Sequence, residues 1–542
     1  MDSLPGYRQP RLSGARRWVR TFAGALAIVA LSLSAWIGVR AFIAYDALVN
    51  AQSRIGDITS SLASLNFLTL PVAIEEIDHD LGVARSMMSD PIWQALESAP
   101  VVGGSLASVH ELTAALDDFV GDGLLPLAND AQDLSLDALR PNDGQIDLEA
   151  IETLVAAAGS ATGGLHELRA RIEAIDQTAA LGPVRGVITR LLAQVVSADE
   201  SALRAVGVLQ LIEPAIGLEG QRGYAVVLLD SGVDTAIGGQ ALGVLEVTMS
   251  AGAIDVSAPM TAAEAGLDTP QFRELERSPG FPAYAREASL ALGSVWGRDV
   301  DAVLAIDLVG LAYLLDATGP ITTSNGTLLS GESLRETADG ASSVDGGDAT
   351  AVLEVTVSAV VAGEGASRGF LASAVALRDE RRLKMWSSDA VEQEALASTS
   401  LSGDFAVVDA ASTSFGVFVV DHAEAQLRTP VSVGIELLSQ GCASEQQLVI
   451  SLDAGTLAVE RDLIVLGPIG GEISELGGAD SVTLGQPTVE GRDAATAHVR
   501  IDPRGHAVVT VSFAGAAEDD VESSVVTNAR IVPTEVVRLP CP

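Results

Sequence analysis

The segment Thr21 to Val39 contains no charged side chain, and it constrains the topology of the chain more than any other feature. As a helix it would be about 28 Å long, enough to cross the hydrocarbon core of a membrane. Acidic residues dominate the chain after it, and the arginines before it are Arg8, Arg11, Arg16, Arg17 and Arg20. The positive-inside rule predicts a cytoplasmic tail at residues 1–20, a transmembrane anchor helix at 21–44 and an extracytoplasmic remainder.

A cleaved signal peptide is the alternative interpretation of this segment. The apolar run is long for a signal peptide and continues through "AFIAYDALV" at residues 41–49, which favours the anchor. We therefore expect a single-pass protein of the cell membrane, with its amino terminus in the cytoplasm and most of the chain outside.

The formal net charge of the 542-residue chain is −40. A surface of this sign repels phosphate backbones, which argues against nucleic acid as a partner. It also keeps the exterior part away from anionic lipid headgroups, except where the anchor holds it. Because 48% of the residues are hydrophobic and 19% are charged, the chain is globular, and its length allows several domains.

The two cysteines of the chain are Cys442 and Cys541. Cysteines of an exported protein most simply pair, so we expect a disulfide that ties the end of the chain to its last domain. Two buried free thiols are the alternative.

Three patterns follow one another along the exterior part, and together they predict a multidomain α+β fold. Residues 45–218 carry apolar stripes with helical spacing, which predict a helical bundle. Residues 219–425 alternate between strands and helices, as in an α/β domain. Residues 426–542 carry short alternating strands separated by turns, which predict an antiparallel β-sandwich-like domain. The helical stripes comprise Leu106, Val109, Leu112, Leu116 and Phe119, and later Leu165, Leu168, Ile172 and Ile175.

Two acids bracket the strand in "VDAVLAIDLVGLAYLLDATGP" at residues 300–320. Six residues of strand place Asp301 and Asp307 about 20 Å apart, so they cannot share a metal ion. Asp307 precedes a predicted helix that Gly319 ends, and as its N-cap it would contribute about 1 kcal/mol. The carboxyl end of a strand is also where α/β sheets bind ligands. The cap is the favoured interpretation of Asp307, and a ligand-binding role remains the alternative.

The same stretch resembles a bacterial membrane-anchored family of uncharacterised proteins, the domain of unknown function 4012. The resemblance extends, in order, through "SDPIWQALESAPVVGGSL", "LRPNDGQIDL", "RGYAVVLLDSGVDTAIGG", "SPGFPAYAREASLALGSVWG" and "LKMWSSDAVEQEAL". Where the family carries Asn-Asn and Glu ahead of its Gly-Gly, this chain has Asp230-Ser231 and Val233. The resemblance implies an anchored envelope protein.

A more distant resemblance, over the strand and helix around Asp307, is to the LytR-CpsA-Psr enzymes. Those enzymes transfer glycopolymers from a polyprenyl pyrophosphate to peptidoglycan, using an acid, a metal ion and several arginines. The cluster "LRDERR" at residues 377–382 offers arginines suited to pyrophosphate. The candidate binding residues are therefore Arg298, Asp307, Arg381 and Arg382.

The histidines show no metal-binding spacing such as HExxH, and they lie far apart in the sequence. They are His79, His110, His166, His422, His498 and His506. No metal and no other cofactor is predicted. The Gly238-Gly239 turn is more typical of a tight strand connection than of an anion site.

No catalytic signature is present, so our first hypothesis is a non-enzymatic scaffold or binder in cell-surface glycopolymer assembly. Its partners would be the membrane, a cell-wall glycopolymer or envelope proteins. The alternative is a LytR-CpsA-Psr-like phosphotransferase.

Overall fold

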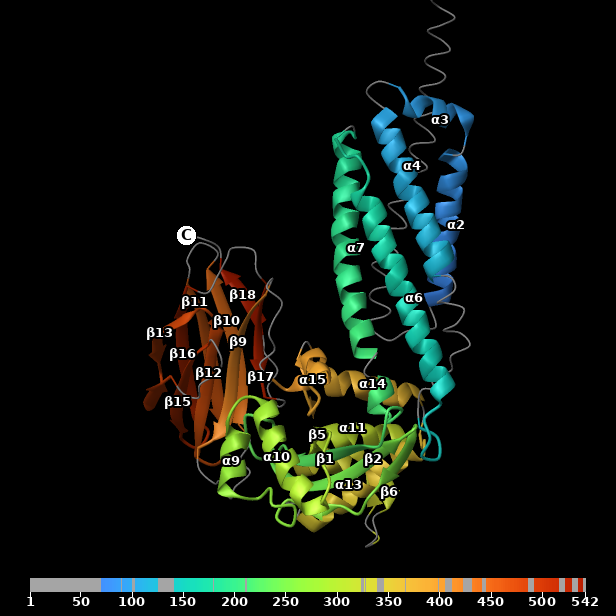
Figure 1. Ribbon diagram of the computed structural model, residues 1–542. Helices are drawn as coiled ribbons and strands as arrows, with labels where there is room; N and C mark the ends of the chain where they lie inside the picture. Colours follow the sequence, from blue (N-terminus) through green and yellow to red (C-terminus); the bar gives the residue numbers. More distant parts are fainter. Residues whose placement is uncertain are drawn as a thin grey trace, which may run out of the picture. The chain divides into compact units, whose positions relative to one another are not determined.

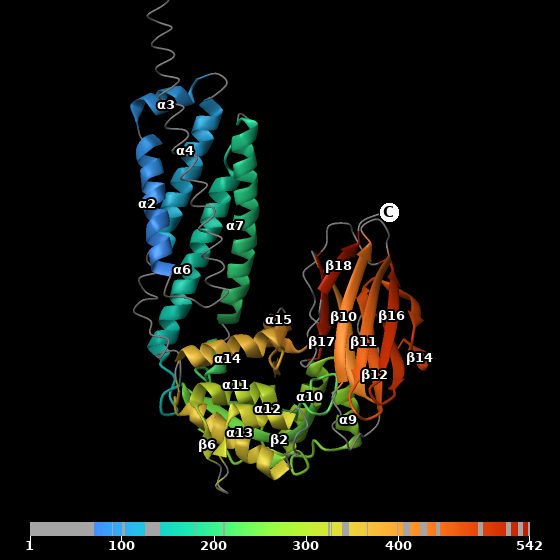
Figure 2. The ribbon, with the colours of Figure 1, turned by 180° about the vertical axis from the view of Figure 1, so that it is seen from behind.

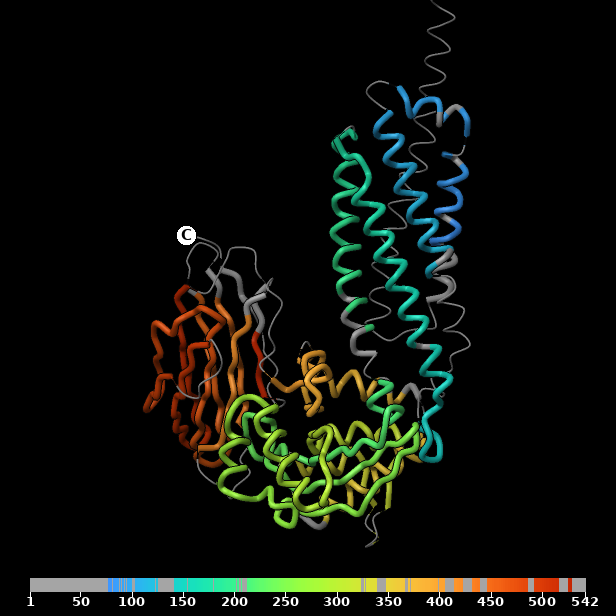
Figure 3. Tube along the Cα trace, in the orientation of Figure 1, coloured from blue at the N-terminus to red at the C-terminus, as the bar shows by residue number. Residues whose placement is uncertain are grey.

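A computed structural model describes residues 70–539 with several gaps, and Figure 3 draws the remaining residues in grey. The gaps are 89, 100–102, 125–140, 179, 210–211, 323–325, 327, 339–345, 366, 398, 405–411, 423–430, 441–444, 486–491, 516–521 and 529–534. The predicted anchor and both cysteines lie outside the described residues. Within the described residues, no helix combines the length and apolar character needed to span a bilayer.

The chain divides into two compact units, residues 1–134 with 153–206 and residues 135–152 with 207–542. The first unit is helical, and its long helices run side by side in Figure 1. Its elements are α2 (Leu70–Met88), α3 (Pro91–Glu97), α4 (Gly103–Asp118), the π-helical turn η1 (Phe119–Leu124), most of α6 (Leu148–Glu173) and most of α7 (Gly182–Leu209). The predicted stripes form its core, where Leu112 and Leu116 of α4 pack with Ile172 of α6 and Ile188 of α7.

The second unit begins with a mixed sheet in the order β3-β2-β1-β5-β8. Its strands are β1 (Arg222–Asp230), β2 (Gln240–Ser250), β3 (Ala253–Val256), β5 (Ala302–Asp307) and β8 (Leu383–Ser387), with β4 (Met260–Thr261) beside β2. Ala251 and Gly252 adopt positive φ in the turn between β2 and β3. Among the described strands of this sheet only β1 and β5 are parallel, because β2 returns as a hairpin and β8 enters from the opposite end.

Helices cover both faces of this sheet, as the alternation along β1 requires. Ala225 and Val227 face α9 (Pro270–Arg277) and α10 (Phe281–Trp296), where they pack with Phe281. Tyr224 and Leu228 point to the other face and pack with the second helical layer. That layer comprises α11 (Leu308–Thr318), α12 (Gly331–Ala338), α13 (Gly346–Val361) and α14 (Ser367–Asp379).

Short elements complete this part of the unit. They are α8 (Ile212–Ala215), β6 (Ile321–Thr322), β7 (Leu328–Leu329), α15 (Ala390–Ala397) and the 3₁₀ turn η2 (Ser400–Ser402).

A β-sandwich follows in the same unit, with sheets ordered β13-β16-β11-β10-β18 and β14-β15-β12-β9-β17 (Figure 2). The two sheets share one core, which contains Phe415, Leu448, Leu463 and Phe513. The predicted antiparallel pattern does not extend to the edge strands β17 and β18, which run parallel to β9 and β10. Strand β9 already belongs to the sandwich, upstream of the predicted boundary at residue 426.

The bounds of the sandwich strands are β9 (Ser412–Asp421), β10 (Val431–Gln440), β11 (Glu445–Ala454), β12 (Val459–Ile469), β13 (Glu472–Gly477), β14 (Ser481–Leu484), β15 (Arg492–Ile501), β16 (His506–Ala514), β17 (Glu522–Thr527) and β18 (Glu535–Leu539).

Charged side chains join the sandwich to the mixed sheet. Arg461 of β12 forms an ion pair with Asp234 of the β1–β2 loop, with Nε and Oδ2 3.2 Å apart. Arg277 of α9 forms another with Asp462 of β12, with Nη2 and Oδ2 2.9 Å apart. The Arg461 side chain is 4% exposed, so water is largely excluded from this contact. Its ion pairs can therefore fix the orientation of the sandwich relative to the mixed sheet.

Candidate functional site

The predicted cap at Asp307 is confirmed. Asp307 ends β5 with an extended backbone, and its Oδ1 accepts a hydrogen bond from the backbone N–H of Gly310 at 2.6 Å. The helix that it starts, α11, ends at Gly319, whose φ is 97°. The local sequence therefore determines this part of the site, because a short acidic side chain before a helix satisfies an otherwise unpaired N–H.

The second carboxylate oxygen of Asp307 is engaged by Arg382. Nη1 of Arg382 donates to Oδ2 of Asp307 at 2.7 Å, and the Asp307 side chain is 2% exposed. The two residues meet because β8 pairs antiparallel with β5, with Ile306 opposite Leu383. Arg382 also donates through Nε to Glu380 at 2.5 Å, and the Tyr313 hydroxyl donates to the same carboxylate at 2.8 Å.

Lys384 is the only lysine of the chain, and it lies beside this ion pair. It is opposite Ala305 in the β5–β8 register, so it shares a sheet face with Arg382, two residues earlier. Its Nζ donates to the backbone oxygen of Arg381 at 3.0 Å. Burial lowers the pKa of Lys384 to about 8, although the nearby charge of Asp307 acts in the opposite direction.

Burial also raises the pKa of Asp307 above its ordinary value. The charge of Arg382 and the N–H of Gly310 oppose this effect, since both stabilise the carboxylate. The carboxylate is thus stabilised by side chains and backbone that are already in place.

Arg381 differs from its neighbours. It occupies a positive-φ position (54°) between α14 and β8, where its side chain is half-buried. Burial lowers the pKa of the Arg381 guanidinium, and no carboxylate among the described residues compensates for it. We call Asp307, Glu380, Arg381, Arg382 and Lys384 the strand-end cluster. It holds three basic and two acidic side chains. Both acids accept hydrogen bonds from Arg382, and the charge of Asp307 also acts on Lys384, whereas no described acid acts on Arg381.

The structure brings together three of the four candidate binding residues and separates the fourth. Asp307, Arg381 and Arg382 belong to the strand-end cluster. Arg298 precedes the amino end of β5, and its Nη2 lies 2.5 Å from Oε1 of Glu246 on β2. Since the strand runs between them, Arg298 does not contribute to a site at Asp307.

The Gly238-Gly239 turn is a tight strand connection. The N–H of Gly239 donates to Oγ1 of Thr235 at 2.8 Å, and the N–H of Gly238 donates to the backbone oxygen of the same residue at 3.1 Å. Both donors are used within the loop, which leaves this turn unsuited to hold an anion.

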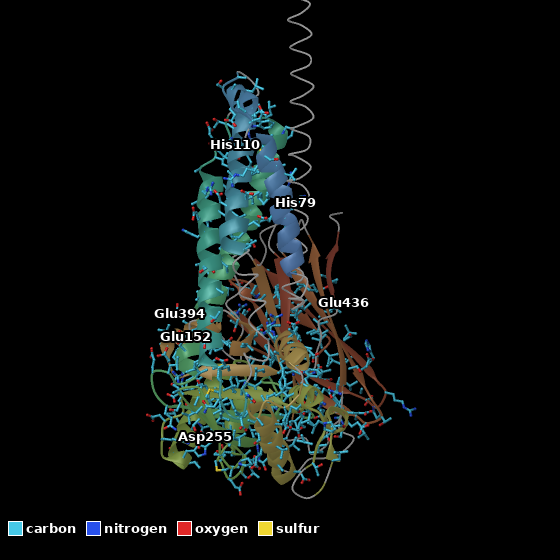
Figure 4. The ribbon with its side chains drawn as sticks, turned by 90° about the vertical axis from the view of Figure 1, so that its right-hand side faces the viewer. His79, His110, Glu152, Asp255, Glu394 and Glu436 are labelled. Atoms are coloured by element: carbon cyan, nitrogen blue, oxygen red, sulfur yellow. The ribbon has the colours of Figure 1, made fainter. Side chains whose placement is uncertain are left out.

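Sequence reasoning missed one group of side chains. The rings of His422 and His498 lie with their centroids 3.9 Å apart on the sandwich, although the two residues are distant in sequence. The expectation that the histidines lie far apart therefore holds in the sequence but fails for this pair in space. Figure 4 marks His79 on α2 and His110 on α4, which are separate positions of the helical unit.

The second unit thus defines a class: a mixed sheet covered by helices on both faces, with a basic cluster at the carboxyl end of its parallel pair, followed by a β-sandwich. The family model described as protein of unknown function (DUF4012) matches residues 219–341, from the approach to β1 through α12. This match supports the resemblance of that segment to the family. It includes Arg298 and Asp307, whereas Arg381, Arg382 and Lys384 lie beyond it.

No curated protein and no solved structure matches the chain. The relationship to the LytR-CpsA-Psr enzymes has no support from these comparisons.

Proposed function

We propose that the protein is a single-pass, membrane-anchored extracytoplasmic protein that binds an anionic cell-surface glycopolymer without transferring it. The anchor is the segment at residues 21–44, which contains the uncharged run from Thr21 to Val39, and the binding group is Arg381 in the strand-end cluster. The observation that carries the proposal is that both oxygens of Asp307 are already engaged, by Gly310 and by Arg382.

This engagement favours binding over phosphoryl transfer. A transferase of the LytR-CpsA-Psr type uses an acid to hold a divalent metal ion against the pyrophosphate. Mg²⁺ takes oxygen ligands with little tolerance for distorted geometry. Asp307 would have to give up its buried, charge-assisted hydrogen bond with Arg382, which is worth roughly 1.5–3 kcal/mol, and Arg382 would keep Glu380 alone. Glu380, the other acid of the cluster, is held by Arg382 and Tyr313.

The basic surplus of the cluster supports anion recognition. A guanidinium offers paired donors that match a phosphate or carboxylate group. No carboxylate among the described residues opposes the effect of burial on the Arg381 guanidinium, and an anionic ligand would supply the missing charge. The chain as a whole carries a net charge of −40, so a local basic group would confine an anionic polymer to one place.

The test titrates the full chain in detergent micelles with a phosphate-bearing wall glycopolymer, and separately with a polyprenyl pyrophosphate, with and without Mg²⁺. We expect glycopolymer binding that does not require Mg²⁺ and that weakens at least tenfold, roughly 1.4 kcal/mol, in Arg381→Gln. Arg378→Gln is the matched control, because Arg378 lies exposed at the end of α14 and forms a surface ion pair with its neighbour Asp379.

Two results would contradict the proposal. Mg²⁺-dependent binding of polyprenyl pyrophosphate that disappears in a folded Asp307→Asn variant would establish the phosphotransferase alternative. Equal glycopolymer affinity of the parent and Arg381→Gln would remove the strand-end cluster from any binding role.

A further inference from the structure

Four side chains from three neighbouring strands gather on one face of the sandwich, at the end nearest α9. They are His422 directly after β9, Glu460 and Asp462 of β12, and His498 of β15. The strand registers explain the gathering. Asp462 is opposite His498, and Arg461 is opposite Asp421, which brings His422 next to Glu460. Side chains at alternate positions of β12 share a face, so all four point the same way.

His422, Glu460 and His498 each offer one potential ligand atom, either ring nitrogen of a histidine or a carboxylate oxygen, and these three atoms lie within 4.8 Å of one another. Around a tetrahedral zinc ion, neighbouring ligand atoms are about 3.3 Å apart. Side-chain rotation can close this difference, because His422 and Glu460 are each 43% exposed. Glu460 forms an ion pair with Arg500, whose Nη1 is 3.6 Å away and whose side chain is 67% exposed. Such a surface pair gives little resistance to a metal ion.

Asp462 fixes the orientation of both imidazoles. Its Oδ1 lies 2.8 Å from Nδ1 of His422 and 3.1 Å from Nδ1 of His498. An ionised carboxylate only accepts hydrogen bonds, so each Nδ1 carries the proton. In a neutral imidazole the Nε2 atom then has a free lone pair, which is the form that binds a metal. Carboxylates in this position typically orient metal-binding histidines.

Asp462 is itself held in place. Nη2 of Arg277 donates to its Oδ2 at 2.9 Å, and Arg277 also donates to the backbone oxygen of Asp421. The carboxylate is 12% exposed, and Oδ1 remains for the two imidazoles. A site with two nitrogen ligands, one carboxylate and an open side toward solvent has the donor set of a zinc site that retains water.

We propose that His422, His498 and Glu460 form a divalent metal site that suits Zn²⁺, with Asp462 as the positioning residue. The ion joins β9, β12 and β15 where Arg277 docks the sandwich on α9. The site is independent of the strand-end cluster and of the proposed glycopolymer binding.

The test uses the full chain in detergent micelles, stripped of metal by a chelator that is then removed. Calorimetric titration with Zn²⁺ should give one saturable site per chain. The double variant His422→Gln, His498→Gln should lower the affinity at least 100-fold. His506→Gln is the matched control, because His506 on β16 also contacts an aspartate, Asp453 at 2.8 Å, but has no second histidine beside it among the described residues.

A second measurement separates positioning from folding. With Co²⁺ as a spectroscopic probe, the parent chain should show the visible absorption of a four- or five-coordinate nitrogen and oxygen site. Asp462→Asn should lower Zn²⁺ affinity about 10- to 100-fold and change the Co²⁺ band. Arg277→Gln removes the same ion pair but keeps the Asp462 carboxylate and its contacts with both imidazoles, so it should change the band less than Asp462→Asn does.

Three results would overturn the proposal. One is the absence of saturable Zn²⁺ or Co²⁺ binding by the folded parent chain. Another is a double histidine variant that binds as the parent does. The last is a Co²⁺ band that is identical in the parent and in the double variant.

Discussion

Glu276 makes the stability of the second unit depend on pH. It lies on α9 with 3% of its surface exposed, and its Oε1 accepts a hydrogen bond from the N–H of Ala241 at 2.9 Å. Burial raises the pKa of Glu276 from 4.5 to about 7, even though the hydrogen bond from Ala241 lowers it. The folded chain therefore binds this proton more tightly than the unfolded chain does.

The sign and size of the effect follow from linkage. A raised pKa in the folded state contributes stability that is complete below about pH 4.5, and that is lost as the pH rises through about 7. Each pH unit between these values is worth about 1.4 kcal/mol, so Glu276 should remove roughly 3 kcal/mol of unfolding free energy by pH 8. Asp421, whose pKa burial raises to about 6, adds a slope of the same sign over part of this range.

Glu276→Gln removes the titration and keeps an oxygen that can accept the bond from Ala241. We expect the unfolding free energy of the variant to lose most of its decline between about pH 5 and 8, whatever constant offset the amide introduces. Pulse-labelling hydrogen exchange across a urea series, read on the peptide that contains β2, reports this unit alone. Glu274→Gln on the exposed side of α9 is the control. A Glu276→Gln variant with the slope of the parent would refute the reasoning.

Three further outcomes can be measured. Asp307→Asn should cost about 1.5–3 kcal/mol rather than the roughly 1 kcal/mol of a simple cap, because it removes the buried charge that faces Arg382 and leaves this guanidinium with Glu380 alone; an unfolding titration that gives about 1 kcal/mol or less would contradict this. Labelling of the denatured, unreduced chain should find no free thiol at Cys442 and Cys541. Two reactive thiols per chain would disprove the bridge that the sequence predicts between them. Protease added to intact cells should remove the chain beyond the anchor at residues 21–44, and full protection would exclude this topology.

The elements that were predictable from the sequence rest on local signals. The strand at β5, the cap at Asp307 and the stop at Gly319 are encoded within one stretch of twenty residues. The β2–β3 turn at Ala251 and Gly252 is equally local. In each case a backbone group has to be satisfied by a residue next to it in the sequence, and few residue types can do so.

The contacts that escaped prediction depend on strand register. Arg382 meets Asp307 because β8 pairs with β5 across 75 residues of chain, and nothing in "LRDERR" specifies that partner. His422 and His498 flank β12 from two different strands, so their spacing in the sequence carries no metal-binding signal. The alternation of side chains along a strand, with a period of two residues, predicts which face of the sheet a side chain takes. It does not predict which strand lies beside it.

The burial of Glu276 also escaped prediction, for a different reason. The helix "PQFRELER" has the composition of a surface helix, and its acids look interchangeable. Glu276 is buried because α9 packs beside the loop that ends at Gly239, where the N–H of Ala241 needs an acceptor. Only the tertiary arrangement distinguishes it from Glu274.

Lys384 carries the only side-chain primary amine of the chain, so its chemical modification can report local opening of the structure around it. The stem of Lys384 packs against Gly403 so closely that a Cβ added there would lie 2.8 Å from its Cδ. Acylating reagents, which modify many surface lysines in an ordinary protein, have one internal target here, and the fold hides it. The rate at which Lys384 is acylated therefore measures how often β8 and η2 separate. A ligand that binds the adjoining Arg381 should therefore lower the rate at which Lys384 is acylated.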